Sequence, residues 1–523
     1  MKKLHLLPAI LALLCTMPVA MALAAPKPAP AEAMKKLAVL RETVDFAHAP
    51  RANSFVDFSR AAFNDGVDKV TVNGLENRFH RYGVTVSLRP QKGWNEGLNT
   101  VAVTAKGKLY TMYVSHHKSI PTVSDYTNKI SLLNGKPFTP LAIYAVDIEQ
   151  IKDAKKFGFN VFHNYMMTRL GDAYPMREFL DTLQKENCYG MIHLQHTEIA
   201  ASNFKPVMER VVRYMNHPAL CWWYLFDEPG IYGIDPEQLV FFNDMVRKLD
   251  PYHTTVSSSW YQKEFQDSVD VDIPQWYHGH AAGMAKTAKE YAEKAAGEWH
   301  DMQSLPILNT HDSAFGCESG GSLNPNSFYD EEVNGKKRGD YPKDSPEYQD
   351  AEKRALALVN DPDHPHRPPT PTYPGSIERM RGQVTTSILA GANGLIYWLY
   401  SDRRMNPRWG IYTVFSPAKN RAEFTQVMRE VKAFAPYFNG FAANAKVERG
   451  DELWYGCRTV DGKFILMMSN VSGKTLEGVL ELPGAPARLY VNNGDETVRL
   501  SDGRLRYSLK ADEGRIYCSE PIR

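Results

Sequence analysis

The middle of the chain alternates between short apolar runs and segments with helical periodicity, and this alternation is the strongest constraint on the fold. Apolar runs of strand length occur at 141–144, 160–163, 190–194, 219–225, 255–258, 269–273, 305–308 and 394–399. Amphipathic helical segments lie between most of them, at 146–157, 174–186, 203–216, 236–249, 287–300 and 376–389. Eight strands with intervening helices over roughly 270 residues match the size of a (β/α)₈ barrel, or TIM barrel. An open doubly wound sheet is the alternative, but residues 144–147 after the first run lack the glycine-rich loop that such sheets usually carry.

The segments on either side of this region have a different pattern of hydrophobic residues. Residues 36–130 and 445–523 contain short alternating runs separated by turn residues such as Asn73-Gly74 and Asp502-Gly503. Each segment is therefore predicted to form a β-sandwich. The fold predicted for the 523-residue chain is an α/β barrel over 131–440 with one β-sandwich domain before it and one after it.

The first residues have the features of a secretory signal peptide. A positive start at 1–3 is followed by the apolar segment 6–24, which ends in small residues, and by the Pro-rich segment 25–30. A transmembrane anchor is the alternative, but Pro8 and Pro18 interrupt the apolar segment. We therefore expect cleavage after residue 24 and a secreted or periplasmic mature protein without a membrane span.

Charge and cysteine content restrict the partners. Lys and Arg total 61 against 60 Asp and Glu, so no net field attracts nucleic acid or an anionic membrane. Export permits disulfides, and Cys457 with Cys518 could connect parts of the last domain. Cys188 and Cys221 adjoin apolar runs, where free buried thiols are common. The oligomeric state is left open.

Polar and aromatic side chains follow most of the predicted strands. Because chemistry in such barrels takes place at the carboxyl ends of the strands, these side chains are candidate substrate ligands. The candidates are Asn164, Gln195, His196, Asp227, Trp260, Trp276, Tyr277, His278, Trp398 and Arg403. Aromatic rings stack on the C–H faces of sugars, and amides, imidazoles and carboxylates bind hydroxyl groups, so a carbohydrate is the predicted partner. Packing at the barrel rim is the alternative role, which we expect for part of this set.

Glu228 is the candidate general acid/base. It ends the most apolar of the runs, and an apolar setting keeps a carboxyl group protonated. Cleavage of a glycosidic bond needs such an acid and a second carboxylate across the sugar. The alternative is that residues 227–229 only begin a loop or helix, since proline suits a first helical turn.

Several segments of the middle region resemble glycoside hydrolase clan A, which contains β-galactosidase-like and cellulase-like barrels. The resemblance lies in the segments 133–138, 155–161, 223–229 and 381–398. It implies a barrel with accessory β-sandwiches and an acid/base at Glu228, with Asp227 where asparagine is usual in the clan.

The seventh predicted strand departs from the pattern of the clan. Clan members carry the nucleophilic glutamate there, whereas residues 305–316 contain no glutamate. Asp312 is the nearest carboxylate and is the predicted second catalytic residue, with Glu318 as the alternative. Asp312 could instead cap the first turn of the loop through its backbone contacts. The Pro-rich segment 317–375 is expected to fold over the catalytic face.

These features predict a secreted glycoside hydrolase acting on a polysaccharide or oligosaccharide. A non-catalytic glycan-binding barrel that has lost its strand-seven nucleophile is the alternative. A metal-dependent enzyme would use His278, His280, His311 or the pair His364 and His366, but no His-Glu-x-x-His or Glu-x-x-His spacing occurs. The sequence therefore predicts no cofactor and no metal.

Overall fold

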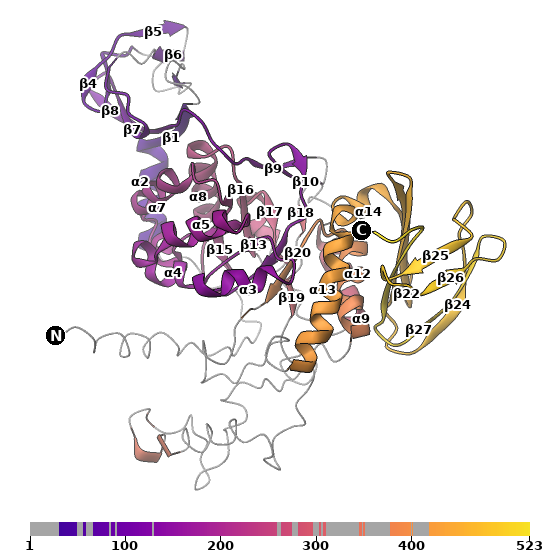
Figure 1. The fold of residues 1–523 in the computed structure, drawn as a ribbon. Helices are drawn as coiled ribbons and strands as arrows, with labels where there is room; N and C mark the ends of the chain where they lie inside the picture. Colours follow the sequence, from indigo (N-terminus) through magenta and orange to yellow (C-terminus); the bar gives the residue numbers. More distant parts are fainter. Residues whose placement is uncertain are drawn as a thin grey trace.

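The computed structural model is described here for most of the chain after residue 30. The described residues are 31–49, 56–58, 66–82, 85–88, 92–127, 130–258, 263–274, 281–295, 303–304, 307–309, 342, 345–347, 349–350, 377–398, 400 and 418–522. Within these ranges the protein is a mixed α/β structure. A parallel sheet with helices lies at its centre, and mixed or antiparallel sheets from both ends of the chain flank it (Figure 1).

The central sheet contains nine described strands, and every neighbouring pair is parallel. Its strands are β12 Leu141–Ile143, β13 Val161–Phe162, β14 Tyr189–His193, β15 Leu220–Asp227, β16 Thr254–Ser258, β17 Val271–Asp272, β18 Gln303–Ser304, β19 Ile307–Asn309 and β20 Leu395–Trp398. Their order is β18-β17-β16-β15-β14-β13-β12-β20-β19. The two end strands, β18 and β19, are separated in sequence only by residues 305 and 306.

Most of the described helices lie between these strands in the sequence, whereas the first precedes the sheet and the last two follow it. The described helices are α2 Ala31–Thr43, α3 Ile151–Lys155, α4 Met166–Leu170, α5 Met176–Lys185, α6 His196–Ala200, α7 Phe204–Tyr214, α8 Pro236–Leu249, α9 Ala281–Ala295, α12 Ile377–Ala390, α13 Ala418–Phe438 and α14 Phe441–Asn444, with 3₁₀ turns η2 Ile148–Gln150, η3 Gly171–Ala173 and η4 Lys263–Ser268. Buried residues recur at helical spacing, as Met176, Phe179, Leu180 and Leu183 do in α5. None of the helices in the described ranges combines the length and hydropathy that a membrane span requires.

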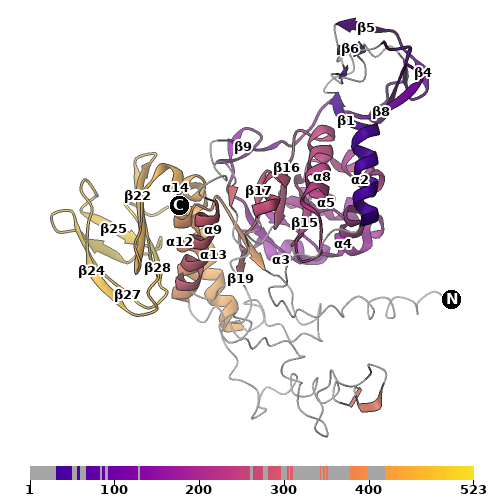
Figure 2. The same cartoon turned by 180° about the vertical axis from the view of Figure 1, so that it is seen from behind.

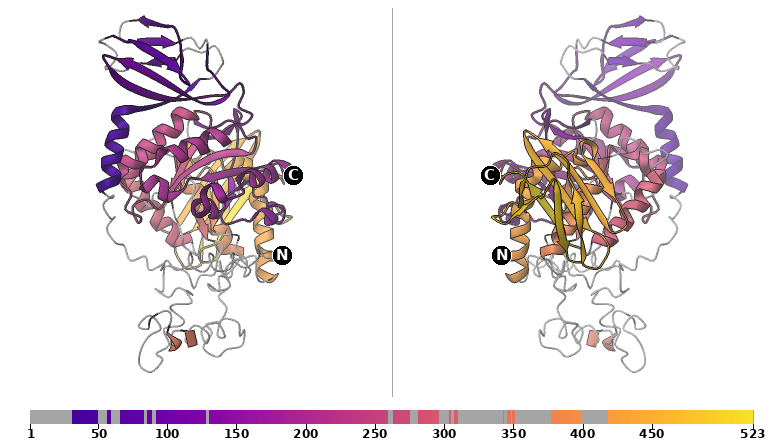
Figure 3. Two further views of the ribbon diagram at one scale, coloured as in Figure 1. Left: turned by 90° about the vertical axis from the view of Figure 1, so that its left-hand side faces the viewer. Right: turned by 90° about the vertical axis from the view of Figure 1, so that its right-hand side faces the viewer.

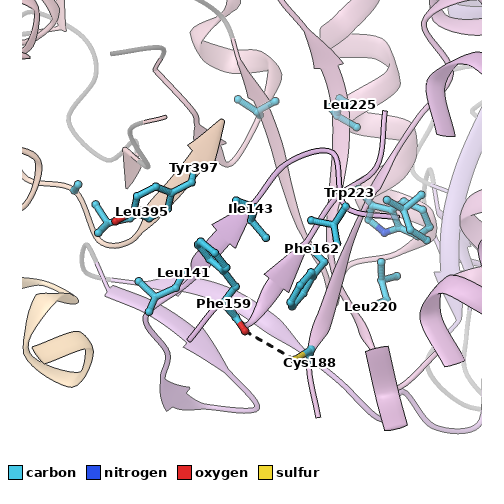
Figure 4. Close-up of a cluster of buried hydrophobic side chains, with 14 of the residues drawn as sticks. Leu141, Ile143, Phe159, Phe162, Cys188, Leu220, Trp223, Leu225, Leu395 and Tyr397 are labelled. Carbon is cyan, nitrogen blue, oxygen red and sulfur yellow. Dashed lines mark hydrogen bonds between the residues drawn. The ribbon is translucent and has the colours of Figure 1, made fainter. Parts of the chain in front are cut away.

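Both faces of the central sheet are buried. Residues of β12, β13, β14, β15 and β20 are divided between two different hydrophobic clusters, so that Ala142 and Ile143 of β12 belong to opposite faces. The larger cluster lies between the sheet and the helices and includes Phe162 and Trp223 (Figure 4). Burial on both faces explains why these strands read as continuous apolar runs in the sequence.

The first sheets of the chain lie at one end of the core, and the sheet formed by residues 124–137 lies beside the core (Figures 2 and 3). Their strands are β1 Val44–Ala49, β2 Val56–Phe58, β3 Lys69–Val72, β4 Leu75–Glu76, β5 Phe79–Tyr82, β6 Thr85–Leu88, β7 Gly97–Ala105, β8 Lys108–His116, β9 Ser124–Thr127, β10 Ile130–Leu133 and β11 Lys136–Pro137. They form one five-stranded sheet, β1-β8-β7-β3-β4, and two three-stranded sheets, β2-β6-β5 and β11-β10-β9. Valines at alternate positions of β3 and β7 give the first sheet its buried face.

The start of this region differs from the sequence prediction. Residues 36–43 were expected to be strand-like, but they belong to helix α2. Ala33, Leu37 and Leu40 are buried at helical spacing against the core, and the hydroxyl of Ser202 donates to the carbonyl oxygen of Ala33 at 2.9 Å. The segment is also rich in the strong helix formers Ala, Leu, Lys and Glu, so propensity and packing agree.

The sheets after the core lie on another side of it (Figure 1). Their strands are β21 Lys446–Arg449, β22 Leu453–Val460, β23 Lys463–Asn470, β24 Leu476–Glu481, β25 Arg488–Val491, β26 Thr497–Arg499, β27 Arg504–Leu509 and β28 Gly514–Cys518. They form the six-stranded sheet β21-β22-β23-β28-β25-β26 and the pair β24-β27. Side chains from both sheets, such as Leu466 and Leu505, share one hydrophobic cluster.

The cysteine pair suggested by the sequence is not a disulfide. Cys457 and Cys518 are both free thiols. Cys457 is opposite Leu466 of β23, and Cys518 is opposite Ile465 of the same strand, so β23 separates the two cysteines. Two strand spacings are about 10 Å, beyond the Cα separation that a disulfide allows. The free thiols expected at Cys188 and Cys221 are confirmed, and both are buried.

A cluster of histidines joins the first sheets to the core. His48, His116 and His117 come from β1 and from β8 with the residue after it, and His48 and His117 lie near Asp250, which follows the end of α8. Nδ1 of His253 donates to Asp250 at 2.8 Å. Burial is the larger cause and the nearby His117 the next, and together they lower the pKa of His48 from 6.5 to about 4. Burial also lowers the pKa of His117. These two imidazoles are therefore neutral near pH 7.

Acidification is expected to destabilise the folded protein through this histidine cluster. In the unfolded chain the imidazoles take up protons near pH 6.5, whereas folded His48 does so only near pH 4. The unfolded state binds more protons between these values, so the midpoint of thermal unfolding is expected to fall as the pH is lowered from 7 to 5. In the His48→Gln variant, which does not titrate at this position, the unfolding midpoint should fall by less than in the wild-type protein over the same pH range. The exposed His80 provides the control, and equal pH dependence of His48→Gln and His80→Gln would contradict the account.

Candidate active site at the carboxyl end of the parallel sheet

The candidate site is built from residues at the carboxyl ends of four neighbouring strands. Tyr144 follows β12, His163 and Tyr165 follow β13, and His193 ends β14. His196 comes three residues later, and Tyr224 and Asp227 belong to the last part of β15. Because the strands are parallel, these ends meet at one edge of the sheet. We call these seven residues the Asp227 network.

Two tyrosines hold the carboxylate of Asp227. The hydroxyl of Tyr224 donates to Oδ1 at 2.7 Å, and the hydroxyl of Tyr165 donates to Oδ2 at 3.0 Å. Tyr144 in turn donates to the hydroxyl oxygen of Tyr224 at 3.1 Å and stacks on Tyr165 with ring centroids 5.5 Å apart. Each carboxylate oxygen therefore has a fixed donor, which sets the direction in which its remaining lone pair points.

Three histidines form a hydrogen-bonded chain beneath Asp227. His163 Nε2 and His193 Nδ1 are 2.9 Å apart, as are His193 Nε2 and His196 Nε2. The backbone N–H of Asp227 donates to His196 Nε2 at 3.3 Å. His193 also stacks on Tyr224 with centroids 4.0 Å apart, which joins the histidine chain to the tyrosines. Burial lowers the pKa of His163 and His193 well below 6.5 and that of His196 to about 3, so all three are neutral.

The hydrogen bonds determine which ring nitrogen of each histidine in this chain carries the proton. His196 Nε2 must accept from the Asp227 N–H, so it carries no proton, and His193 Nε2 donates to it. His193 Nδ1 then accepts from His163 Nε2. This leaves His163 Nδ1, which has no partner among the described residues, as an unprotonated acceptor. The reverse order would leave a buried N–H without an acceptor, which is the costlier arrangement.

Burial also changes the acidity of Asp227. It raises the pKa of Asp227 from 3.8 to about 6, and the hydrogen bonds from Tyr224 and Tyr165 oppose the change because they stabilise the charged form. Asp227 is therefore ionised near pH 7 and gains a proton close to pH 6. A carboxylate that titrates in this range and is only partly buried can accept a hydrogen bond from a ligand.

Glu228 follows Asp227 in an unusual backbone conformation. Its φ is +54°, in the left-handed region, which costs a non-glycine residue about 1–2 kcal/mol. The conformation is held by its N–H, which donates to the carbonyl oxygen of Ser258 at 2.9 Å, and by its carbonyl oxygen, which accepts from the N–H of Ile231 at 3.0 Å. The side chain is half-buried. Strain of this kind at a polar residue beside a perturbed carboxylate is typical of functional sites.

The structure brings three of the predicted site residues together: Asp227, Glu228 and His196. Asn164, by contrast, is only 2% exposed and is bound within its own loop. Its Nδ2 donates to Val146 and Asp147, and its Oδ1 accepts from the N–H of Met166. Both amide hydrogens are used, so we assign Asn164 a structural role and remove it from the candidate substrate ligands.

Gln195 lies beside the Asp227 network without a hydrogen bond to it among the described residues. A Cβ on Gly171 would come within 2.5 Å of Oε1 of Gln195, so the amide packs directly on the backbone of η3. The φ of Gly171 is +53°, which also favours glycine there. Gln195 therefore contacts the neighbouring loop, and its half-buried side chain stays at the edge of the site.

The remaining predicted residues lie outside the described part of the chain. They are Trp260, Trp276, Tyr277, His278, Asp312 and Arg403, together with Glu318, the metal candidates His280, His311, His364 and His366, and the side chain of Trp398. Nearly all of the segment 317–375 is outside it as well. In the described part, no group of three or more His, Cys, Asp or Glu side chains is arranged to hold a metal ion.

The site also contains residues that were not predicted to bind substrate: Tyr144, His163, Tyr165, His193 and Tyr224. Strand alternation contains a signal for two of them, since Tyr144 and Tyr224 have the same parity as the inward-facing Ala142 and Trp222. The hydrogen bonds between different strands could not be derived from alternation alone.

The tyrosine bonds to Asp227 can be tested by titration. Tyr165→Phe removes one donor to the charged carboxylate, so the pKa of Asp227 is expected to rise above its value of about 6. The measurement is a ¹³C NMR titration of aspartate-labelled protein, with Asp227→Asn identifying the resonance. Tyr214→Phe, on helix α7, should leave the titration unchanged. An unchanged Asp227 pKa in Tyr165→Phe would contradict the assigned hydrogen bond.

Comparison with known proteins gives only distant structural likenesses. No protein-family model matches the chain, and no curated protein matches it. Among solved structures, the chain is similar to a family 39 glycoside hydrolase from Bacteroides cellulosilyticus, with 11% identity over 91% of this chain and 98% of that chain and a TM-score of 0.42. It is also similar to a GH30 endoxylanase from Clostridium papyrosolvens (10% identity, 77% and 98% coverage, TM-score 0.40). A third is an Anoxybacillus α-amylase (11% identity, 72% and 90% coverage, TM-score 0.43).

Proposed function

We propose that this chain is an exported glycoside hydrolase in which Glu228 is the general acid/base. The observation that carries the proposal is the carboxylate pair Asp227–Glu228 at the carboxyl edge of the parallel sheet. One member is strained into a left-handed conformation, and the other is held by two tyrosines over a buried histidine chain. Acid-catalysed cleavage of a glycosidic bond needs a positioned carboxyl group, and the edge of such a sheet is where it would act.

The proposal includes a closed (β/α)₈ barrel with flanking β-sandwich domains. Strands β18 and β19 form opposite ends of the described sheet, yet Ser304 and Ile307 are only three residues apart. Three residues span at most about 11 Å. The two ends of the sheet must therefore lie within roughly two strand spacings of about 5 Å each, which supports closure.

In this proposal Asp227 binds a substrate hydroxyl beside the scissile bond. Each of its oxygens accepts one tyrosine hydroxyl, so each retains a lone pair for a ligand. His196 is assigned a positioning role, because it accepts from the backbone N–H of Asp227, immediately before the two carboxylates. The second catalytic carboxylate is proposed to be Asp312 or Glu318, after the seventh strand. Export is proposed from residues 1–24, which have the features of a signal peptide.

Removal of the Glu228 carboxyl group tests this assignment. The Glu228→Gln variant should lower the turnover of unactivated oligosaccharides by about 10²–10⁴-fold, because a general acid contributes that factor. The assay measures reducing sugar released from xylohexaose, cellohexaose, mannohexaose, maltohexaose and tetragalacturonic acid. Glu237→Gln, on the exposed first turn of α8, is the control and should keep the wild-type rate.

Two results would contradict the proposal. Wild-type rates in Glu228→Gln on a substrate that the protein cleaves would exclude Glu228 as the acid/base. Binding of a glycan by the wild-type protein without any cleavage would favour the non-catalytic glycan-binding barrel, for which the missing glutamate at 305–316 is the specific argument.

A further inference from the structure

Tyr232 is an exposed aromatic ring beside the candidate catalytic pair. It is 47% exposed, and the other large hydrophobic residues exposed to this degree in the described ranges are Val39, Leu75, Leu109 and Val479. These four are aliphatic and belong to α2 or to the flanking sheets. Tyr232 is thus the exposed aromatic among them, and it lies four residues after Glu228.

A compact turn holds Tyr232 in place. Its N–H donates to the carbonyl oxygen of Glu228 at 3.4 Å, and the N–H of Ile234 donates to that of Pro229 at 3.0 Å. Gly233 closes the turn with a φ of +68°, and Ile234 is only 2% exposed. The exposed ring is therefore presented by a well-bonded loop whose end is anchored in the core.

One side of the ring is packed against the Asp227 network. Its centroid is 5.4 Å from that of His196 and 5.9 Å from that of Phe226, at interplanar angles of 56° and 63°. His196 and Phe226 are themselves stacked, with centroids 4.0 Å apart. The pKa of Tyr232 is raised first by burial of its inner side and then by the nearby carboxylates of Asp227 and Glu228. The phenol thus has a fixed inner side next to the catalytic pair and an open outer side.

We propose that the open side of Tyr232 is a stacking platform for a pyranose ring of the substrate, next to the bond that Glu228 protonates. A sugar presents apolar C–H faces to an aromatic ring and hydroxyl groups to a carboxylate, and Tyr232 and Asp227 supply these two surfaces side by side. This inference rests on the proposed function and adds a residue that recognises the sugar.

Binding measurements on an inactive background test the platform. In Glu228→Gln protein, a second substitution Tyr232→Ala should weaken binding of the best-cleaved oligosaccharide of the five named above by about tenfold, and Tyr232→Phe should change it by less than about twofold, because the ring face and not the hydroxyl group makes the contact. In otherwise wild-type protein, Tyr232→Ala should raise KM with little change in kcat. Leu109→Ala, which alters an exposed residue of similar size on β8, is the control and should change neither.

The outcomes separate this inference from the proposed function. Suppose that the wild-type protein cleaves the oligosaccharide, but that adding Tyr232→Ala to Glu228→Gln protein does not weaken binding. The proposed stacking role of Tyr232 is then wrong, while the proposed hydrolase function is retained. If Tyr232→Phe loses as much affinity as Tyr232→Ala, the hydroxyl group acts and stacking is excluded. If none of the five oligosaccharides is bound or cleaved, both proposals fail. Equal thermal unfolding midpoints of the variants and the parent confirm that the fold is retained.

Discussion

The bonds from Tyr165 and Tyr224 to Asp227 hold this carboxylate at the edge of the sheet, and the geometry of the candidate site depends on them. Tyr165 comes from the loop after β13, and Tyr224 and Asp227 belong to β15, so the bond from Tyr165 spans β14 while the bond from Tyr224 lies within β15. Tyr144, after β12, adds a further strand through its hydroxyl group. A charged carboxylate partly removed from water is costly unless donors surround it, and these hydroxyl groups compensate for part of that cost.

The same arrangement explains the neutral histidines. A protonated imidazole at His163 or His193 would be a buried charge without a carboxylate partner among the described residues, whereas in the neutral chain each ring is hydrogen-bonded to its neighbour. The chain ends at the peptide N–H of Asp227 and so supports the backbone immediately before the strained Glu228. The backbone of the site is thus supported by neutral groups, and Asp227 carries the charge near pH 7.

Much of the central fold could be predicted because it follows local periodicity. Strands buried on both faces produce apolar runs in the sequence. A helix such as α8 is indicated by Asp235 and Pro236 at its start and by apolar residues at helical spacing. The prediction of strand-like structure failed at residues 36–43, which form part of helix α2. Tertiary contacts determine the structure there, because the helix packs against the core. The sequence left open whether Cys457 and Cys518 pair, because strand order determines their separation and cannot be derived from the sequence.

The site was predictable in part for the same reason. Asp227, Glu228 and His196 follow apolar runs and could be found as strand ends. Asn164 donates to Val146 and Asp147 in its own loop, and its place after a strand could not show this, because an asparagine there can serve either the loop or a ligand. Tyr165 was missed because its partner is 62 residues away in sequence.

The central claim is that this edge of the sheet binds a glycan at Asp227 and Glu228. The most direct measurement is a crystal structure of the Glu228→Gln protein soaked with the oligosaccharide that the wild-type protein cleaves best. The account predicts a glycosidic oxygen within about 3 Å of the side-chain amide at position 228, and a sugar hydroxyl donating to Asp227. A glycan bound elsewhere on the molecule, with the Asp227 network unoccupied, would contradict it.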